Sequence, residues 1–425
     1  MKTIKTRIGD HKGPQLWQQF VVFLLSCAIV VTRRPDALFH AQFWAEDGHV
    51  WFAEAYNLGW LTALCHPWAG YLQTFSRLGA SLALLAPFSF APLTLNLIAI
   101  AAQALPVNLL LSSRSSGWGS LRFRALCAGL YLALPNCGEI STGITNSLWV
   151  LALCAFLLLV ASKPTGAIGR AFDIVVILLC GLTGPYCIFL LPIAVFLALK
   201  RRDAWRRVVA ILLAGAGVIQ VCELVIAGPT GRLHPPLGAN LWQLIRILAG
   251  QIYLGTLLGG NGLSHYSGTG FSILFVSAAV LGSLIVAFCF FNSSQEMKLF
   301  ILFCGMVLAA SLIYPMCNPP AGVSAWESLS ESPNVRYWFF PMLAFAWSLL
   351  WCSRSRHRIL RYGSIALLIL TCVGIARDWR HPAFQDLHFA EYAKRFEAAA
   401  PGTTMTIPEN PETWYLTLVK HPKGQ

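Results

Sequence analysis

The sequence predicts an all-α polytopic membrane protein, and three observations lead to this fold class. The chain has 425 residues, of which 56% are hydrophobic. Only 12% are charged, whereas soluble domains carry roughly 25%. Apolar stretches of about 17 to 25 residues recur along the chain, and such stretches are long enough to cross a bilayer core of about 30 Å. The first stretch follows several lysines and an arginine and lacks an A-x-A-like cleavage site, which indicates an uncleaved anchor.

Basic residues give this helical chain a topology, because they concentrate in the loops that stay in the cytoplasm. The clusters are the N-terminus, 114–124, 163–170, 200–207, the loop with Lys298, and 354–361. With all of these inside, the chain forms a bundle of about 11 transmembrane helices. The expected spans are roughly 16–32, 92–112, 124–136, 147–161, 171–183, 186–199, 208–227, 270–291, 299–316, 337–352 and 360–376.

Two further apolar segments are expected to lie in the membrane interface. A span over 72–90 would invert every later loop, so this segment is predicted to lie flat, with its Arg77 face in water and its Leu/Ala face in lipid. A second interfacial helix is expected over 241–258. The predicted organisation is a transmembrane domain over 1–376, which includes a long first outer loop (33–91), and an extracytoplasmic tail over 377–425. The tail combines one short helix with extended pieces and is large enough to cap a site.

The first outer loop holds an adjacent acid pair, Glu46 and Asp47, in the segment AQFWAEDGHVWF. A carboxylate at a membrane boundary keeps its charge only where water or a partner reaches it, so the pair indicates an aqueous site. Two close carboxylates raise each other's pKa, which suits a base that takes a proton from a hydroxyl. The alternative is an ordinary juxtamembrane acid pair, with the flanking aromatic residues forming an interfacial belt.

Other outer loops supply candidate binding residues. Arg336 with Tyr337, and Arg77, are candidates for a phosphate group, because arginine forms paired charge-assisted hydrogen bonds to phosphate oxygens; interfacial anchoring is the competing explanation. Residues expected to contact a sugar or an acceptor are Tyr71, Glu139, Asn146, Trp149, Tyr186 and His265.

Several function classes lack their sequence signals. The net charge of +13 is explained by the cytoplasmic loops, so no nucleic-acid partner is expected. The chain has no phosphate-binding glycine loop for ATP and no Cys/His spacing for zinc. If a metal is used, Glu46 and Asp47 are its expected ligands, and a divalent ion such as Mg²⁺ or Mn²⁺ is expected.

Six segments resemble bacterial members of the GT-C superfamily of integral-membrane glycosyltransferases. An acid pair in the first extracytoplasmic loop of a chain with ten or more helices is typical of that superfamily. The segments are WAEDGHVWFAEAYNLGW, PWAGYLQTFSRLGA, LPNCGEISTGITNSLW, TGPYCIFLLP, NVRYWFFPMLAF and IPENPETWYLTL, and they span nearly the whole chain.

The resemblance implies sugar transfer on the outer face of a bacterial cytoplasmic membrane. The donor would be a sugar on a polyprenyl phosphate, and the acceptor an envelope glycan, a lipid or a surface protein. Asp47, or failing it Glu46, would deprotonate the acceptor hydroxyl in an inverting displacement. Arg336, with Arg77, would stabilise the leaving polyprenyl phosphate.

Two other classes stay open. A transporter or flippase of lipid-linked glycans would line a path with charges such as Asp173, Glu223 and Arg336, and it would show internal repeats. A membrane acyltransferase would need a catalytic histidine in or beside a span, whereas the histidines lie in loops.

Overall fold

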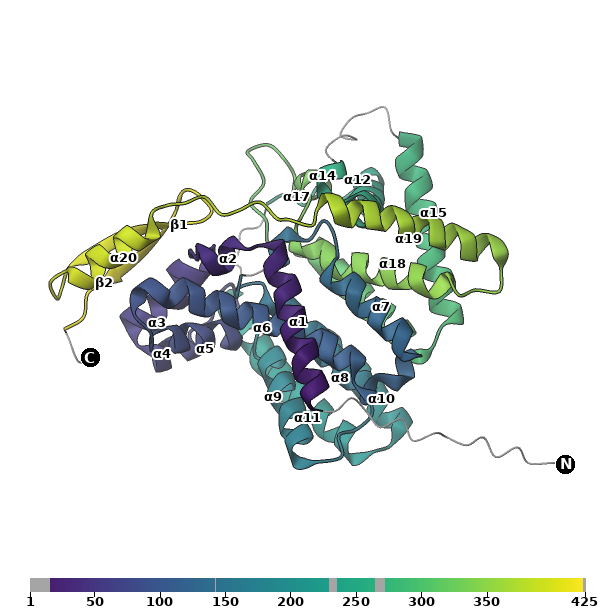
Figure 1. Ribbon diagram of the computed structural model, residues 1–425, viewed down its shortest axis with the longest axis horizontal. Helices are drawn as coiled ribbons and strands as arrows, with labels where there is room; N and C mark the ends of the chain where they lie inside the picture. The colour runs from purple at the N-terminus through teal and green to yellow at the C-terminus, as the bar shows by residue number, and fades with distance from the viewer. Residues whose placement is uncertain (1–15, 142, 229–234, 264–271, 423–425) are drawn as a thin grey trace.

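The computed structural model describes residues 16–141, 143–228, 235–263 and 272–422. The chain is mostly helical, and its one sheet within these ranges is a two-stranded hairpin near the C-terminus. Figure 1 shows the helices in chain order. The longer ones are α1 (Leu16–Arg33), α6 (Ala91–Leu111), α7 (Leu121–Leu132), α8 (Ser147–Val160), α9 (Ala167–Gly181), α10 (Tyr186–Arg201), α11 (Ala204–Ala227), α15 (Ser272–Asn292), α16 (Gln295–Ile313), α18 (Phe339–Cys352) and α19 (Arg358–Arg377).

Seven helical segments in the described ranges are long and apolar enough to cross a membrane, which agrees with an all-α polytopic class. Six correspond to expected spans. The seventh is Leu241–Leu258, where the sequence predicts an interfacial helix; it comprises α12 (Leu241–Arg246), η6 (Ile247–Leu254) and α13 (Gly255–Leu258). The expected spans at α7, α8, α9, α10 and α18 are shorter helices. α1, α15 and α19 turn most of their apolar surface outward, as lipid-facing helices do.

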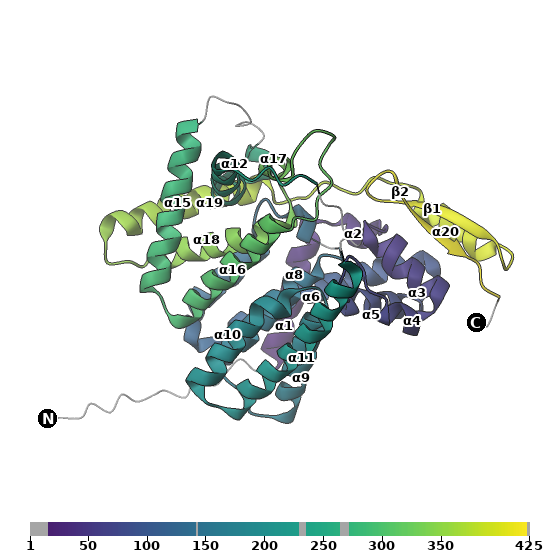
Figure 2. The same ribbon diagram turned by 180° about the vertical axis from the view of Figure 1, so that it is seen from behind.

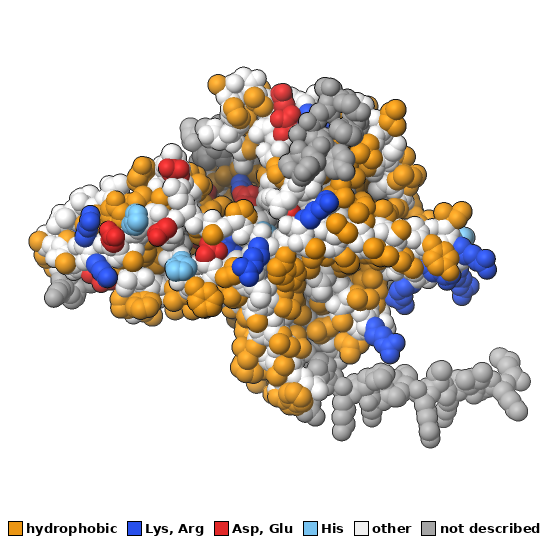
Figure 3. All heavy atoms as spheres, turned by 45° about the horizontal axis from the view of Figure 1, so that its top comes forward, with side chains coloured by type: hydrophobic (Ala, Val, Ile, Leu, Met, Phe, Trp, Pro, Cys, Tyr) orange, Lys and Arg blue, Asp and Glu red, His pale blue; other side chains and the backbone are white. Residues whose placement is uncertain are grey.

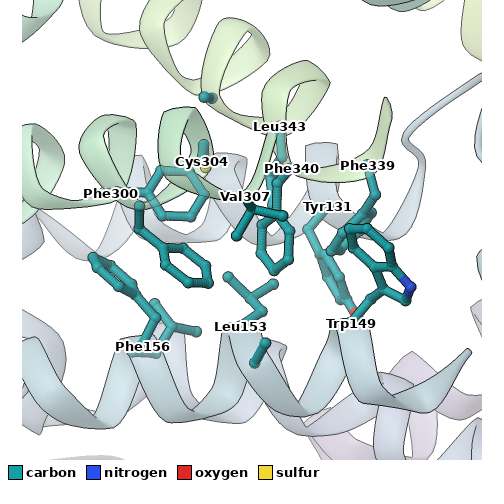
Figure 4. Packing of buried hydrophobic residues seen from close by; sticks show 14 of the residues in the cluster. Tyr131, Trp149, Leu153, Phe156, Phe300, Cys304, Val307, Phe339, Phe340 and Leu343 are labelled. Atoms are coloured by element: carbon teal, nitrogen blue, oxygen red, sulfur yellow. The ribbon is translucent and has the colours of Figure 1, made fainter. Parts of the chain in front are cut away.

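The centre of the bundle is α8, which is apolar all round because it is covered on every side. All of its residues except Leu148 are buried. Figure 4 shows Trp149, Leu153 and Phe156 of this helix packed against residues of α7, α16 and α18. Figure 2 shows α9, α10 and α11 side by side on the other flank, where they contact one another.

The loops meet in two separate groups. At one end, the loop before α7 contacts the loop after α8 through Arg114 Nε and the Ser162 carbonyl, 2.8 Å apart. At the same end, Lys200 and Arg201, which end α10, bind Gln295 and Glu296, which begin α16. These are the loops that the sequence predicts to share the cytoplasmic side. The first loop, the loop before α8, the segment before α18 and the C-terminal tail meet at the other end.

The first loop and the tail form one unit with its own hydrophobic core. The loop contains α2 (Asp36–Phe39), η1 (Asp47–Phe52), α3 (Ala53–Leu58), α4 (Trp60–Cys65), α5 (Thr74–Ala83) and η2 (Phe88–Phe90). The tail contains α20 (Phe389–Ala398) and the antiparallel strands β1 (Thr404–Glu409) and β2 (Trp414–Val419). Phe43 and Phe88 of the loop pack against Phe389 of α20, and Phe88 also contacts Phe396. Phe52 of the loop packs on Phe43 and Phe88. The tail is therefore docked on the first loop (Figure 1).

The prediction of a wet Arg77 face over 72–90 is wrong. The helix there is the shorter α5, and the Arg77 side chain is fully buried. Arg77 donates to Glu54 of α3 at 2.8 Å. Because that carboxylate offsets the charge of the guanidinium, the arginine can lie inside the loop unit instead of in water.

Candidate functional site

The Asp47 carboxylate lies where the first loop meets the loop before α8. It begins η1 and is buried. Its Oδ1 accepts hydrogen bonds from the Thr145 amide at 3.0 Å and the Thr145 hydroxyl at 2.6 Å, and its Oδ2 accepts a longer one from the Ile144 amide at 3.3 Å. Burial raises the pKa of Asp47 to about 7, the Thr145 hydrogen bonds oppose this rise, and the nearby charge of Glu46 adds to it. Such a carboxyl can hold or release a proton near neutral pH.

Glu46 is the more open member of the acid pair. It is half-buried, and no side chain or amide in the described ranges hydrogen-bonds its carboxylate. Its charge raises the pKa of both Asp47 and Arg336, so Glu46 lies near the start of α18 as well as beside Asp47. Its carboxylate is available to a ligand.

The backbone just before the pair has an unusual conformation. Ala45 has φ 50°, a left-handed conformation that is costly for a residue with a Cβ. The Ala45 amide donates to the Asn410 carbonyl at 2.6 Å, and the Asn410 amide donates to the Phe43 carbonyl at 3.2 Å. The tail therefore holds the bend that presents Glu46 and Asp47, as expected for strain maintained by surrounding structure.

Arg336 forms an ion pair with Glu139 beside the acid loop. Its amide donates to Glu139 Oε2 at 2.7 Å, Nη1 binds the other carboxylate oxygen, and Nη2 donates to the Met316 carbonyl at 3.2 Å. Burial lowers the pKa of Arg336, but Glu139 and the nearby Tyr337 and Glu46 raise it more, so the guanidinium stays charged. About a quarter of the Arg336 side chain is exposed (27%), which leaves it accessible to an anion.

An aromatic floor lies under this ion pair. The Trp149 ring is 5.4 Å from that of Tyr186 and 5.9 Å from that of Tyr337. The Tyr337 hydroxyl accepts from the Met316 amide at 2.6 Å, and the Tyr71 hydroxyl approaches the Met316 sulfur at 3.3 Å. All four rings are buried. They shape and support the site more than they line its surface.

The structure thus brings nine of the eleven candidate residues together. Asn146 belongs to this group because its Nδ2 donates to the Glu139 carbonyl at 2.8 Å. Figure 3 shows, on the face that is the top of the molecule in Figure 1, a hollow that contains both basic and acidic side chains. The nine are Glu46, Asp47, Tyr71, Glu139, Asn146, Trp149, Tyr186, Arg336 and Tyr337.

The other two candidates are Arg77 and His265. Arg77 lies behind the acid loop, with its guanidinium 5.1 Å from the Trp51 ring centroid. Trp51 in turn donates from Nε1 to the Thr145 hydroxyl at 2.8 Å, so Arg77 supports the Asp47 loop through Trp51. His265 lies outside the described residues.

Sequence reasoning missed a second cluster, made by His49, Glu409 and two tryptophans. His49 Nδ1 lies 2.9 Å from Glu409 Oε1, and the His49 ring contacts Trp68 and Trp414 edge to face. The available signals were the position of His49 just after the acid pair and the tail motif IPENPETW, to which no site residue was assigned.

The residues offer limited ligands for a metal. Within the described ranges, no three His, Cys, Asp or Glu side chains are grouped to hold an ion. The Glu46 carboxylate has no partner in the described part of the chain, whereas both Asp47 oxygens already accept protein hydrogen bonds. A divalent ion would therefore be held by Glu46 together with substrate oxygens.

In comparisons with known proteins, no family model and no curated protein matches this chain.

Proposed function

We propose that this protein is a glycosyltransferase of the GT-C type that transfers a sugar from a polyprenyl phosphate to an acceptor hydroxyl. The observation that carries the proposal is that the loop before α8 joins a buried acid with a pKa near neutrality, Asp47, to a charged, partly exposed arginine, Arg336. Asp47 binds Thr145 of this loop, and Arg336 binds Glu139 of the same loop. A reaction that removes a proton from one group and expels a phosphate from another needs both.

The arrangement of the loops supports an active site on the outer side. We propose that α1, α6, α7, α8, α9, α10, α11, α15, α16, α18 and α19 each cross the membrane, which gives about 11 spans. The loops rich in lysine and arginine then share the cytoplasmic side, as the distribution of charge in membrane proteins requires. The candidate site lies at the opposite end, facing the exterior of a bacterial cytoplasmic membrane, where lipid-linked sugars serve as donors.

The proposed reaction is a single displacement. Asp47 takes the proton of the acceptor hydroxyl, whose oxygen attacks the anomeric carbon. The bond from that carbon to the phosphate oxygen breaks with inversion, and the polyprenyl phosphate leaves with its electron pair. Arg336 stabilises the charge that develops on this phosphate. Asp47 Oδ2, which has only the one long hydrogen bond, is the better placed oxygen for the proton.

Glu46 has a second role in this scheme. Because its carboxylate has no hydrogen-bond partner among the residues that the structure describes, it can accept hydrogen bonds from sugar hydroxyls or hold a divalent ion against the donor phosphate. It is also the alternative base.

The transporter alternative has weaker support. Asp173, one of the charges expected to line a path, accepts two hydrogen bonds from Arg114, at 2.9 and 2.6 Å. This pair lies at the end opposite to Arg336, between the loops on the cytoplasmic side. The two hydrogen bonds between Arg114 and Asp173 favour a structural contact over a charge that lines a transport path.

The test compares the masses of envelope glycans and glycoproteins in the host with the wild-type chain, with Asp47→Asn, and with Glu331→Gln. Glu331 is an exposed outer carboxylate (62%) away from the acid pair, so it serves as the matched control. Loss of a hexose- or pentose-sized increment in the Asp47 variant alone, at equal protein level, supports the proposal. If deleting the gene removes no increment, the transferase proposal fails and the transporter becomes the better hypothesis.

A further inference from the structure

The imidazole of His49 is held in one orientation and one tautomer. Its Nδ1 lies 2.9 Å from Glu409 Oε1 and 3.2 Å from the Ala45 carbonyl oxygen. Both partners are acceptors, so Nδ1 carries a proton. Nε2 has no partner within the described ranges, and a quarter of the side chain is exposed (25%). The ring therefore presents a free nitrogen in a fixed position.

The carboxylate that orients His49 is part of a closely fitted contact. The Glu409 side chain is fully buried, and its Oε1 also accepts the His49 amide at 3.2 Å. Gly48 makes this approach possible, because a Cβ at that position would overlap Glu409 Oε2. A buried carboxylate with this many specific contacts fixes the histidine in place.

Two tryptophans pack against the His49 ring. The Trp414 ring centroid lies 4.9 Å from that of His49, and the Trp68 centroid lies 6.0 Å away, both nearly perpendicular. Glu409 and Trp414 are directly paired across the tail hairpin, so one turn supplies both groups. Trp414 is exposed and Trp68 is half-buried. Apolar ring surfaces beside a hydrogen-bonding group suit a ligand with both C–H faces and hydroxyls.

This cluster lies next to the acid pair. His49 follows Asp47 by two residues, and the charge of Glu46 acts on His49 and Glu409 as well as on Asp47 and Arg336. Because His49 and Asp47 belong to the same short helix η1, a ligand on His49 lies close to the proposed base, and the donor phosphate would lie at Arg336.

We propose that His49, Trp68 and Trp414 form the subsite that binds the acceptor, and that this acceptor is a saccharide. A sugar hydroxyl bonds to His49 Nε2, and a C–H face of the same ring packs on Trp414. This inference rests on the proposed function and adds the substrate class. It makes His49 a binding residue and Glu409 a positioning residue.

The test uses saturation-transfer difference NMR on the full chain in lipid nanodiscs, which avoids sugar-based detergents. The probes are the methyl glycosides of glucose, mannose, galactose and arabinose. His49→Asn is the informative variant, because its amide nitrogen replaces Nδ1 as the donor to Glu409 but nothing replaces Nε2. Trp414→Ala removes the exposed ring. Trp60→Ala is the matched control, since Trp60 is an exposed tryptophan (54%) elsewhere in the first loop.

At least one probe should receive saturation from the wild-type protein. His49→Asn and Trp414→Ala should weaken binding about fivefold, as expected when one hydrogen bond or ring contact is lost, whereas Trp60→Ala should not. Unchanged thermal unfolding of the histidine variant shows that the contact with the tail persists. The inference is overturned if no probe binds, if His49→Asn and Trp414→Ala bind like wild type, or if both tryptophan variants lose binding equally, as in an interfacial belt.

Deletion of the gene, read together with the binding data, separates the two proposals. If the wild-type chain binds the probe and the deletion leaves the host glycans unchanged, the subsite stands and the transferase assignment fails. If Asp47→Asn removes the glycan increment while His49→Asn and Trp414→Ala keep full probe binding, the transferase stands and the subsite fails.

Discussion

Replacing Asp47 with Asn should change stability in opposite directions at low and at high pH. Asn has nearly the same shape as Asp but cannot ionise. In the wild-type chain, burial raises the pKa of Asp47 from its ordinary value of 3.8 to about 7. The folded state therefore binds the proton more tightly than the unfolded state. The stability that comes from this difference is fully present below pH 3.8 and is lost as the pH rises through 7.

The magnitude follows from the pKa and from the hydrogen bonds. A rise from 3.8 to about 7 corresponds to about 4 kcal/mol, at about 1.4 kcal/mol per pH unit. Asn can accept from both Thr145 groups through Oδ1, but its Nδ2 then faces the Ile144 amide, which is also a donor. Such a buried mismatch costs about 1–3 kcal/mol. The variant should therefore be less stable than wild type at pH 4 and more stable at pH 8.

The assay is thermal unfolding of both proteins in nanodiscs at pH 4 to 8, with sugar transfer measured in parallel. Wild-type transfer should rise about tenfold per pH unit below 7 and level off above it, because the base must be ionised. The variant should lose about 10²–10⁴-fold in rate, the usual contribution of a general base. A stability difference that does not vary with pH would refute the inference that the Asp47 carboxyl is buried and has a raised pKa. An active Asp47 variant together with an inactive Glu46→Gln variant would transfer the base role to Glu46.

Three further changes test other parts of the site and of the fold. Arg336→Lys cannot keep both guanidinium contacts, from Nη1 to Glu139 and from Nη2 to the Met316 carbonyl, so the glycan increment should fall about tenfold or more at equal protein level; full activity would show that the guanidinium does not serve the leaving phosphate. Gly48→Ala should displace the Glu409 carboxylate and expose the tail to limited proteolysis, with loss of activity; an unchanged cleavage pattern would contradict the role of the tail contact. Asp173→Asn removes the buried carboxylate that pairs with the half-buried Arg114, so the unfolding midpoint should fall, by a free energy of about 2 kcal/mol, at normal specific activity. Normal stability with lost activity would instead place Asp173 on a functional path.

The helices could be predicted because the signal for a membrane helix is local. An apolar stretch of sufficient length identifies itself without knowledge of its neighbours. The burial of Arg77 could not be predicted in this way, because it depends on Glu54, which lies 23 residues away in the sequence. Composition showed that α8 is apolar, but only the packing shows that it is the centre of the bundle.

The same distinction applies to the site. Glu46 and Asp47 were found because acids are rare near membrane boundaries. Trp149 and Tyr186 were predicted as sugar contacts, yet they are buried in the aromatic floor, and burial is not visible in a short motif. The contact between His49 and Glu409 spans 360 positions of sequence. No local pattern joins residues so far apart.

The long sequence separation between the acid loop and the tail also determines when the site can form during synthesis of the protein. The acid loop leaves the ribosome early, but Glu409 and Asn410, which hold its backbone, are synthesised after the last helix of the bundle. Long-range contacts of this kind form late in folding. In an incomplete chain, the acid loop would therefore be flexible and would lack the conformation needed for catalysis. The bundle can be fully inserted before the site exists, and the final hairpin completes it.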